Sequence, residues 1–201
     1  MKIEVVELKK SASLDAMKFL AQAMSHDATR AILNLIHVEP PTVRALGETL
    51  GKIEKLEFEF IAVATDGRRL HAARIEGQME PGDYRIIKAN QSYMILAQDI
   101  HGATYPNWNH VVPKFDPKDM KRIDLVSTKP DMGVRAFKLV CELHALNKGH
   151  FNLDFIMQAT QGMSSCFVHQ IDSFSSVVIQ DQTENWERLA VVMPVRDFRS
   201  K

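Results

Sequence analysis

The chain has 201 residues, 45% of them hydrophobic, which is enough apolar material for one full core or two small ones. Its 25 Lys and Arg residues balance 25 Asp and Glu residues, so any contact with nucleic acid must come from a local basic patch. Two cysteines are too few for a disulfide framework or a zinc site. Because there is also no secretory signal and no bilayer-spanning apolar run, we expect a soluble cytoplasmic protein without membrane partners.

The N-terminal part of the chain combines strand and helix patterns. Residues 2–8 partly alternate and predict a strand. Ser13 is a candidate N-cap for a helix that begins at Leu14 and ends near residue 26. Residues 30–38 are rich in aliphatic side chains and predict a second strand, which ends before two consecutive prolines.

A hairpin is predicted in the middle of the first half. Residues 39–55 have the character of an insertion, with helical spacing at 42–50. Residues 56–64 then alternate and predict a half-buried strand, and residues 70–75 predict its partner. The Thr-Asp-Gly sequence at 65–67 predicts a tight turn between them, because Asp-Gly supports positive φ.

Two further strands are predicted within residues 84–98, on either side of Asn90. Residues 102–113 have the composition of a connector, and Pro106 and Pro113 exclude a regular helix there.

Residues 134–146 fit two patterns. Helical spacing relates Phe137 to Val140 and Cys141, whereas strict alternation relates Phe137 to Leu139 and Cys141. We favour a strand. A short helix is then predicted after its cap Asn152, ending at Gly162. Three strands follow, at 165–171, 175–181 and 188–195.

The order strand–helix–strand–strand–strand therefore occurs at both ends of the chain, as a weak internal repeat. Two βαβββ halves predict an α+β fold of antiparallel sheets with helices packed on one side. We expect an N-terminal half at 1–101, a connector at 102–113 and a C-terminal half at 114–201.

Two distant segments carry a family resemblance. Residues 63–70 read Val-Ala-Thr-Asp-Gly-Arg-Arg-Leu, and residues 189–196 read Leu-Ala-Val-Val-Met-Pro-Val-Arg. In this order they resemble the bacterial DNA polymerase III beta sliding clamp, and residues 23–34, 104–113 and 151–158 resemble other parts of that family. Clamp chains carry three domains of comparable size, for which this chain is too short. The resemblance does not decide whether the chain forms one clamp-like domain with elaborations or two reduced clamp-like domains.

The resemblance implies a pocket for short linear peptides, formed where the two segments meet. Its positions here are Leu33, Thr65, Gly67, Arg68, Arg69, Leu70, Pro113, Val191, Met193, Pro194, Val195 and Arg196. An apolar cleft with a few polar groups at its rim suits an extended peptide with apolar anchors. Arg68 stands where a His is common in the family. Clamps line the ring with helices whose basic residues face DNA; here the first helix offers Lys18 and, just after it, Arg30.

The function that the resemblance implies is a processivity factor in DNA replication, which binds rather than catalyses. It would form a closed homo-oligomeric ring on duplex DNA, without sequence preference, and tether DNA polymerase and other proteins with clamp-binding motifs. No catalytic motif, cofactor site or metal site is apparent in the sequence. The alternatives are a peptide-binding adaptor or decoy for replication proteins that forms no ring, and a structural descendant with neither activity.

Overall fold

The computed structural model divides the chain into two units, Met1–Val111 and Val112–Lys201. The structure describes residues 5–9, 11–40, 59–76, 79–100, 102–125, 132–145, 149–182 and 186–195. The predicted helical insertion at 42–50 and the first residues of the strand predicted at 56–64 lie outside these ranges. None of the described helices is both long and apolar enough to cross a membrane.

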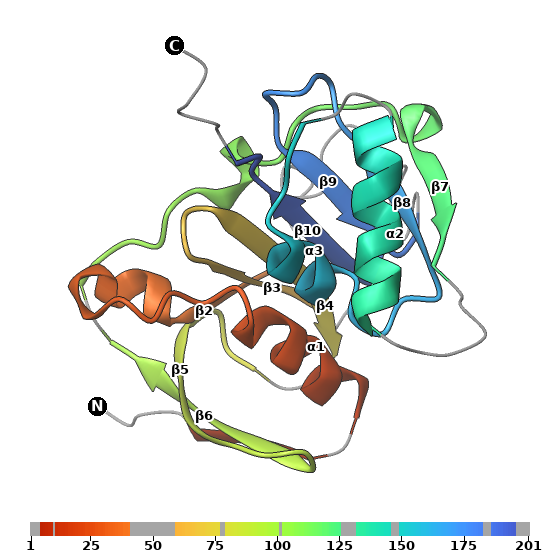
Figure 1. Cartoon of the computed structure of the whole chain (residues 1–201). Helices are drawn as coiled ribbons and strands as arrows, with labels where there is room; N and C mark the ends of the chain where they lie inside the picture. Colours follow the sequence, from red (N-terminus) through yellow and green to blue (C-terminus); the bar gives the residue numbers. More distant parts are fainter. Residues whose placement is uncertain are drawn as a thin grey trace. The chain divides into compact units, whose positions relative to one another are not determined.

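The first unit is an antiparallel sheet with one α-helix on a face (Figure 1). Its strands are ordered β1-β6-β5-β2-β3-β4. In chain order its elements are β1 (Val5–Lys9), α1 (Ala12–Ala21), the 3-10 helix η1 (Ala28–Asn34), β2 (Ile36–Glu39), β3 (Glu59–Thr65), β4 (Arg69–Glu76), β5 (Gly82–Ala89), β6 (Tyr93–Asp99) and the 3-10 helix η2 (Trp108–His110).

The second unit is an antiparallel sheet ordered β7-β8-β9-β10, with two helices on the same face (Figure 1). Its elements are the 3-10 helix η3 (Pro117–Asp119), β7 (Lys121–Asp124), α2 (Met132–Ala145), α3 (Leu153–Ala159), β8 (Ser165–His169), β9 (Val177–Gln180) and β10 (Arg188–Val192). The predicted α+β class of antiparallel sheets with helices is confirmed. The second unit opens with β7 instead of the strand favoured at 134–146 and has a second helix, and the first unit continues into β5 and β6, the two strands predicted within 84–98. The expected domain boundaries at 101 and 114 stay a prediction.

The turn at Asn90, the helix cap at Asn152 and the helix end at Gly162 form as predicted, because each depends on the chemistry of a few neighbouring residues. Asn90 accepts hydrogen bonds from the backbone N–H groups of Ser92 (2.7 Å) and Tyr93 (2.9 Å), which closes the predicted β5–β6 hairpin. Asn152 caps α3 by accepting from the N–H of Asp154 at 2.8 Å. The helix-terminating Gly162 has the positive φ of 77° expected after a helix end.

The start of the first helix was predicted two residues too late. Ser11, not Ser13, is the N-cap of α1, and its hydroxyl accepts from the N–H of Leu14 at 3.2 Å. Ser13 lies inside the helix, is buried, and donates to the carbonyl of Glu76 at 2.6 Å. The helix also ends earlier than expected, at Ala21.

The strand predicted at 30–38 is wrong in its first half, where the chain forms η1, and right from Ile36 onwards. Asp27 accepts hydrogen bonds from the backbone N–H (2.9 Å) and hydroxyl (2.7 Å) of Thr29. The Asn34 side chain donates back to the carbonyl of Asp27 at 3.2 Å. Such local bonds offer the backbone an alternative to a sheet ladder.

The strand favoured at 134–146 is also wrong, because this segment is helix α2. Ala136, Leu139 and Leu143 are buried, at helical spacing, whereas Phe137 is 61% exposed and Cys141 is exposed. The buried stripe therefore follows the helical period, and the alternating set is split between two faces.

The β3–β4 hairpin of the first unit is buried on both faces rather than half-buried. On one face, Ala64 pairs with His71 and Ala62 pairs with Ala73, and all four are buried. Helix α1 packs against this face, because His71 bonds and stacks with Phe19 of the helix. Small alanines let the helix approach the strands closely.

Replacing Leu139 with Ala should lower the free energy of unfolding by about 2–5 kcal/mol, because a fully buried leucine leaves a cavity. Phe137→Ala is the matched control on the exposed face of α2 and should cost less than about 1 kcal/mol. Urea denaturation followed by circular dichroism measures both. Equal losses at the two positions would contradict a helix with this buried face.

Candidate peptide-binding site

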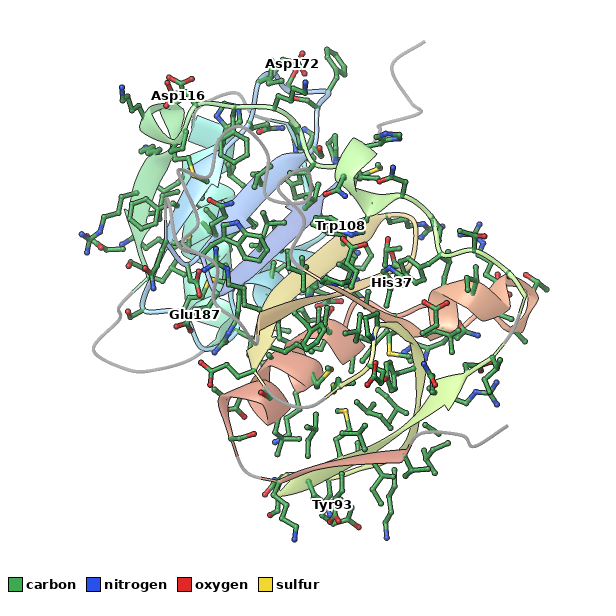
Figure 2. The ribbon with its side chains drawn as sticks, turned by 180° about the vertical axis from the view of Figure 1, so that it is seen from behind. His37, Tyr93, Trp108, Asp116, Asp172 and Glu187 are labelled. Carbon is green, nitrogen blue, oxygen red and sulfur yellow. The ribbon has the colours of Figure 1, made fainter. Side chains whose placement is uncertain are left out.

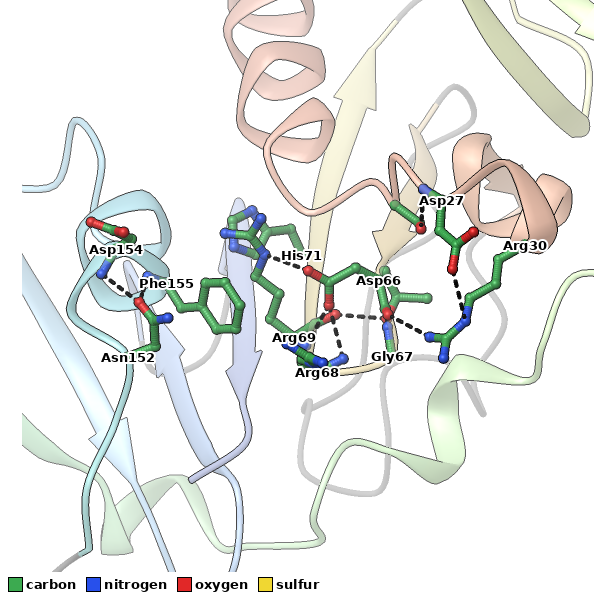
Figure 3. Close-up of polar contacts among 12 residues, drawn as sticks. Asp27, Arg30, Asp66, Gly67, Arg68, Arg69, His71, Asn152, Asp154 and Phe155 are labelled. Carbon is green, nitrogen blue, oxygen red and sulfur yellow. Dashed lines mark hydrogen bonds and ion pairs between the residues drawn. The ribbon is translucent and has the colours of Figure 1, made fainter. Parts of the chain in front are cut away.

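The turn between β3 and β4 brings five of the predicted site residues together (Figure 3). The Thr65 hydroxyl donates to the carbonyl of Arg69 at 2.6 Å and accepts from the N–H of Gly67 at 3.1 Å. Gly67 has a φ of 85°, the left-handed region that glycine adopts without strain. Thr65, Gly67, Arg68, Arg69 and Leu70 thus form one closed hairpin end.

Asp66, which the sequence analysis treated only as a turn residue, organises this hairpin end. Its carboxylate accepts from the N–H groups of Arg68 (2.8 Å) and Arg69 (3.1 Å). The same carboxylate pairs with the Nε of Arg69 at 3.1 Å. With its side chain only 9% exposed, Arg69 stabilises the turn, and Arg68 is the arginine that the turn displays to solvent.

Arg30, predicted to contact DNA, lies over the same turn. Its Nη1 donates to the carbonyl of Asp66 at 3.3 Å, and a Cβ at Gly67 would come within 3.4 Å of that nitrogen. Arg30 and the half-buried Leu33 both belong to η1, which meets the turn through Arg30.

Lys18, the other residue predicted to contact DNA, is engaged elsewhere. It lies on α1, where its Nζ donates to the carbonyl of Gln91 at 2.7 Å and lies 4.0 Å from a carboxylate oxygen of Asp15. Lys18 and Arg30 therefore bond to different parts of the first unit, the β5–β6 turn and the β3–β4 turn.

The second unit carries the other predicted site residues. Val191 is buried in β10, and beyond that strand Met193 is 44% and Val195 is 55% exposed, with Pro194 half-buried between them. The N–H of Val195 donates to the carbonyl of His150 at 2.7 Å, which fixes the chain after the strand. Pro113 is also half-buried in this unit, and Arg196 lies outside the described residues. The segment after β10 therefore displays two apolar side chains on a backbone that is held in place.

Potential metal ligands and one buried thiol were the remaining candidates for chemistry in the described part of the chain. No cluster of three or more His, Cys, Asp or Glu residues there is arranged to hold a metal ion. Burial raises the pKa of the Cys166 thiol to about 12, so that it stays protonated and unreactive at neutral pH.

His71 is a buried titratable group directly behind the candidate site, on β4 next to Leu70. Its Nδ1 donates to the carbonyl of Phe19 at 2.7 Å, and the two rings stack with centroids 4.2 Å apart. Complete burial lowers the pKa of His71 from 6.5 to about 4, because a charged imidazole would lose its hydration. The folded protein therefore keeps this ring neutral.

Comparison with known proteins by sequence finds nothing. No protein-family model matches the chain, and no curated protein matches it either.

Comparison of structures finds bacterial sliding clamps. The chain superposes on Caulobacter crescentus pol III beta with a TM-score of 0.61 and 14% identity, over 97% of this chain and 66% of that chain. For a sliding clamp from Pseudomonas aeruginosa bound to griselimycin, the TM-score is 0.58 at 13% identity, over 96% of this chain and 66% of that one. The DNA polymerase III beta subunit of Thermotoga maritima gives 0.57 at 13% identity, over 96% and 65%.

The likeness establishes the fold. Nearly the whole chain adopts the clamp-like α+β architecture that the sequence resemblance implied, while it spans slightly under two thirds of the length of these clamps.

The neutral state of His71 predicts an acid-sensitive fold. Between about pH 6.5 and pH 4, His71 is protonated in the unfolded chain but stays neutral in the folded chain. As the pH falls through this range, His71 should therefore lower the free energy of unfolding by up to about 3 kcal/mol. Urea denaturation at a series of pH values should show a shallower decline for His71→Gln between pH 6.5 and 4. Parallel curves for the two proteins would refute the assignment.

Proposed function

We propose that the protein is a sliding-clamp-like processivity factor, which tethers DNA polymerase and other replication proteins to duplex DNA through a peptide-binding site. The observation that carries the proposal is the clamp-like fold over 96–97% of the chain. It is supported by the Thr65–Leu70 turn and the exposed Met193 and Val195. The role is binding without catalysis or a cofactor.

The chemistry proposed for the site is capture of short linear peptides. Met193 and Val195 offer an apolar surface for the anchors of a partner, and the flexible thioether of methionine adapts to different side chains. Arg68 offers a charged donor for a carboxylate or a peptide carbonyl. Tethering raises the local concentration of the partner on DNA and so increases processivity.

Encirclement of DNA requires several copies of the chain, because one copy spans about two thirds of a clamp chain. We propose a closed homo-oligomer that joins through the outer edges of its sheets, where β1 and β7 each pair with one described strand. With a net charge of zero, contacts to phosphates would come from local basic side chains.

The second candidate function is a peptide-binding adaptor or decoy for replication proteins that forms no ring. The adaptor is favoured by the hydrogen bonds that the two residues predicted to contact DNA make within the protein. Lys18 donates to the carbonyl of Gln91 and Arg30 donates to the carbonyl of Asp66, so that each of these charges is already partly engaged within the fold.

Met193→Ala and Arg68→Ala should each weaken peptide binding about 5- to 30-fold, as expected for side chains that contact the peptide directly. Griselimycin, which the Pseudomonas aeruginosa clamp binds, is a suitable first probe, and calorimetry measures its affinity. Arg68 is preferable to Arg69, since loss of Arg69 also breaks its pair with Asp66. Phe137→Ala, on an exposed helix face, is the control. Unchanged affinity in both site variants would remove the peptide-site assignment.

A ring predicts a solution mass that is a whole multiple of the chain mass and is constant across a light-scattering concentration series. It also predicts retention on circular duplex DNA that is lost when the DNA is linearised, because a closed ring leaves only over an end. A monomer at every concentration would rule out the sliding function and leave the adaptor.

A further inference from the structure

Residues 105–110, here called the strap, lie over the face of β2 that α1 leaves uncovered. Ala64 pairs with His71, which contacts α1, so both side chains lie on the face of the sheet that α1 covers. Val63, the preceding residue of the strand, therefore points to the opposite face. Val63 pairs with His37 of β2, and His37 stacks on Tyr105 with ring centroids 4.8 Å apart. Tyr105 and Trp108 of the strap are both buried.

His37 holds the strap through a chain of polar contacts that ends at Trp108, and both residues are labelled in Figure 2. Its Nδ1 lies 2.7 Å from a carboxylate oxygen of Asp83 on β5, and its Nε2 lies 3.4 Å from Glu39. The other carboxylate oxygen of Glu39 accepts from the indole N–H of Trp108 at 3.0 Å. One histidine thus contacts the strap directly through Tyr105 and indirectly through Glu39 and Trp108.

The charges around His37 favour its protonated form. Burial alone would lower the pKa of His37, but its bonds with Asp83 and Glu39 outweigh burial and raise it to about 9. The hydrogen bond from His37 lowers the pKa of Glu39. Beyond these partners, β5 carries Arg85, which pairs with Asp99 of β6, and β3 presents the apolar Val63. The strap adds the Tyr105 phenol, whose pKa burial raises above its usual range.

The strap lies next to the strand that leads into the candidate peptide-binding site. Tyr105 stacks on His37, and His37 pairs with Val63 of β3. Thr65 follows Val63 by two positions on the same face of β3, and its hydroxyl closes the β3–β4 turn. A displaced Tyr105 would therefore uncover the face of β3 just before the turn.

We propose that His37 is a positioning residue, whose positive charge clasps the strap to the sheet and so holds the Thr65 end of the candidate peptide-binding site in place. The clasp itself is independent of the proposed function, and its effect on ligand affinity rests on that function. Since His37 is charged in the folded state up to about pH 9, the clasp is closed at neutral pH and opens in alkali.

Amide hydrogen exchange of the full chain tests the clasp without a ligand. In the wild-type protein, protection factors at 105–110 and at the Thr65–Leu70 turn should fall about tenfold as the pH rises from 7 to 10, with a midpoint near 9. His37→Gln, which cannot be charged, should show the lowered protection already at pH 7 and no further fall. His37→Lys, which restores the charge without the ring, should recover part of the protection at the strap.

Trp108→Phe provides a second variant in case His37→Gln does not fold, because it removes only the indole bond to Glu39. It should loosen the strap while keeping a pH midpoint near 9. Protection at 105–110 that is independent of pH in the wild type, or equal in wild type and His37→Gln, would overturn the proposal.

Griselimycin affinity, measured on the same proteins, separates the clasp from the proposed function. Weaker binding by His37→Gln at pH 7, with the wild type converging on it above pH 9, supports positioning of the site. Absence of binding by the wild type would count against the proposed function, while the exchange results would still decide whether His37 holds the strap and the turn.

Discussion

Burial of both faces of the β3–β4 hairpin is the constraint on which the first unit depends. Each face of a strand pair must be covered by something, and here α1 covers Ala62, Ala64, His71 and Ala73 while the strap covers the face of Val63. Alanines on the helix face allow a close approach of helix and sheet. The turn at the end of the hairpin is closed by its own hydrogen bonds from Thr65 and Asp66.

Such burial places two histidines in opposite electrostatic situations. His71 faces a helix carbonyl and an aromatic ring, no carboxylate of the described residues is bonded to it, and so it is held neutral. His37 is partly buried between two carboxylates and so is held charged. Desolvation acts against charge at both positions, and the difference lies in the ion pairs that offset it. One residue type therefore makes the unit sensitive to acid at one face and to alkali at the other.

The clamp-like fold persists here at 12–14% identity to the solved clamps, because a fold depends on the pattern of buried and exposed positions more than on particular side chains. A peptide-binding function depends on particular side chains. The side chains that we propose for this function are Arg68, Met193 and Val195, all three of which are exposed. The two positions proposed for DNA contact are bonded within the fold instead, which is why encirclement and peptide capture are separable hypotheses.

The sequence by itself determined the features whose chemistry is complete within a few residues. The Asp66-Gly67 turn, the Asn90 turn and the Asn152 cap each place a side-chain acceptor two or three residues before the N–H groups it binds. Tertiary structure alone decided the helix at 132–145, because its apolar residues fit two periods and the choice depends on which face finds a partner. It also brought Arg30 to Asp66, 36 positions away, and His37 to Asp83, 46 positions away. No local pattern encodes such pairs, since they exist only once the strands between them have paired.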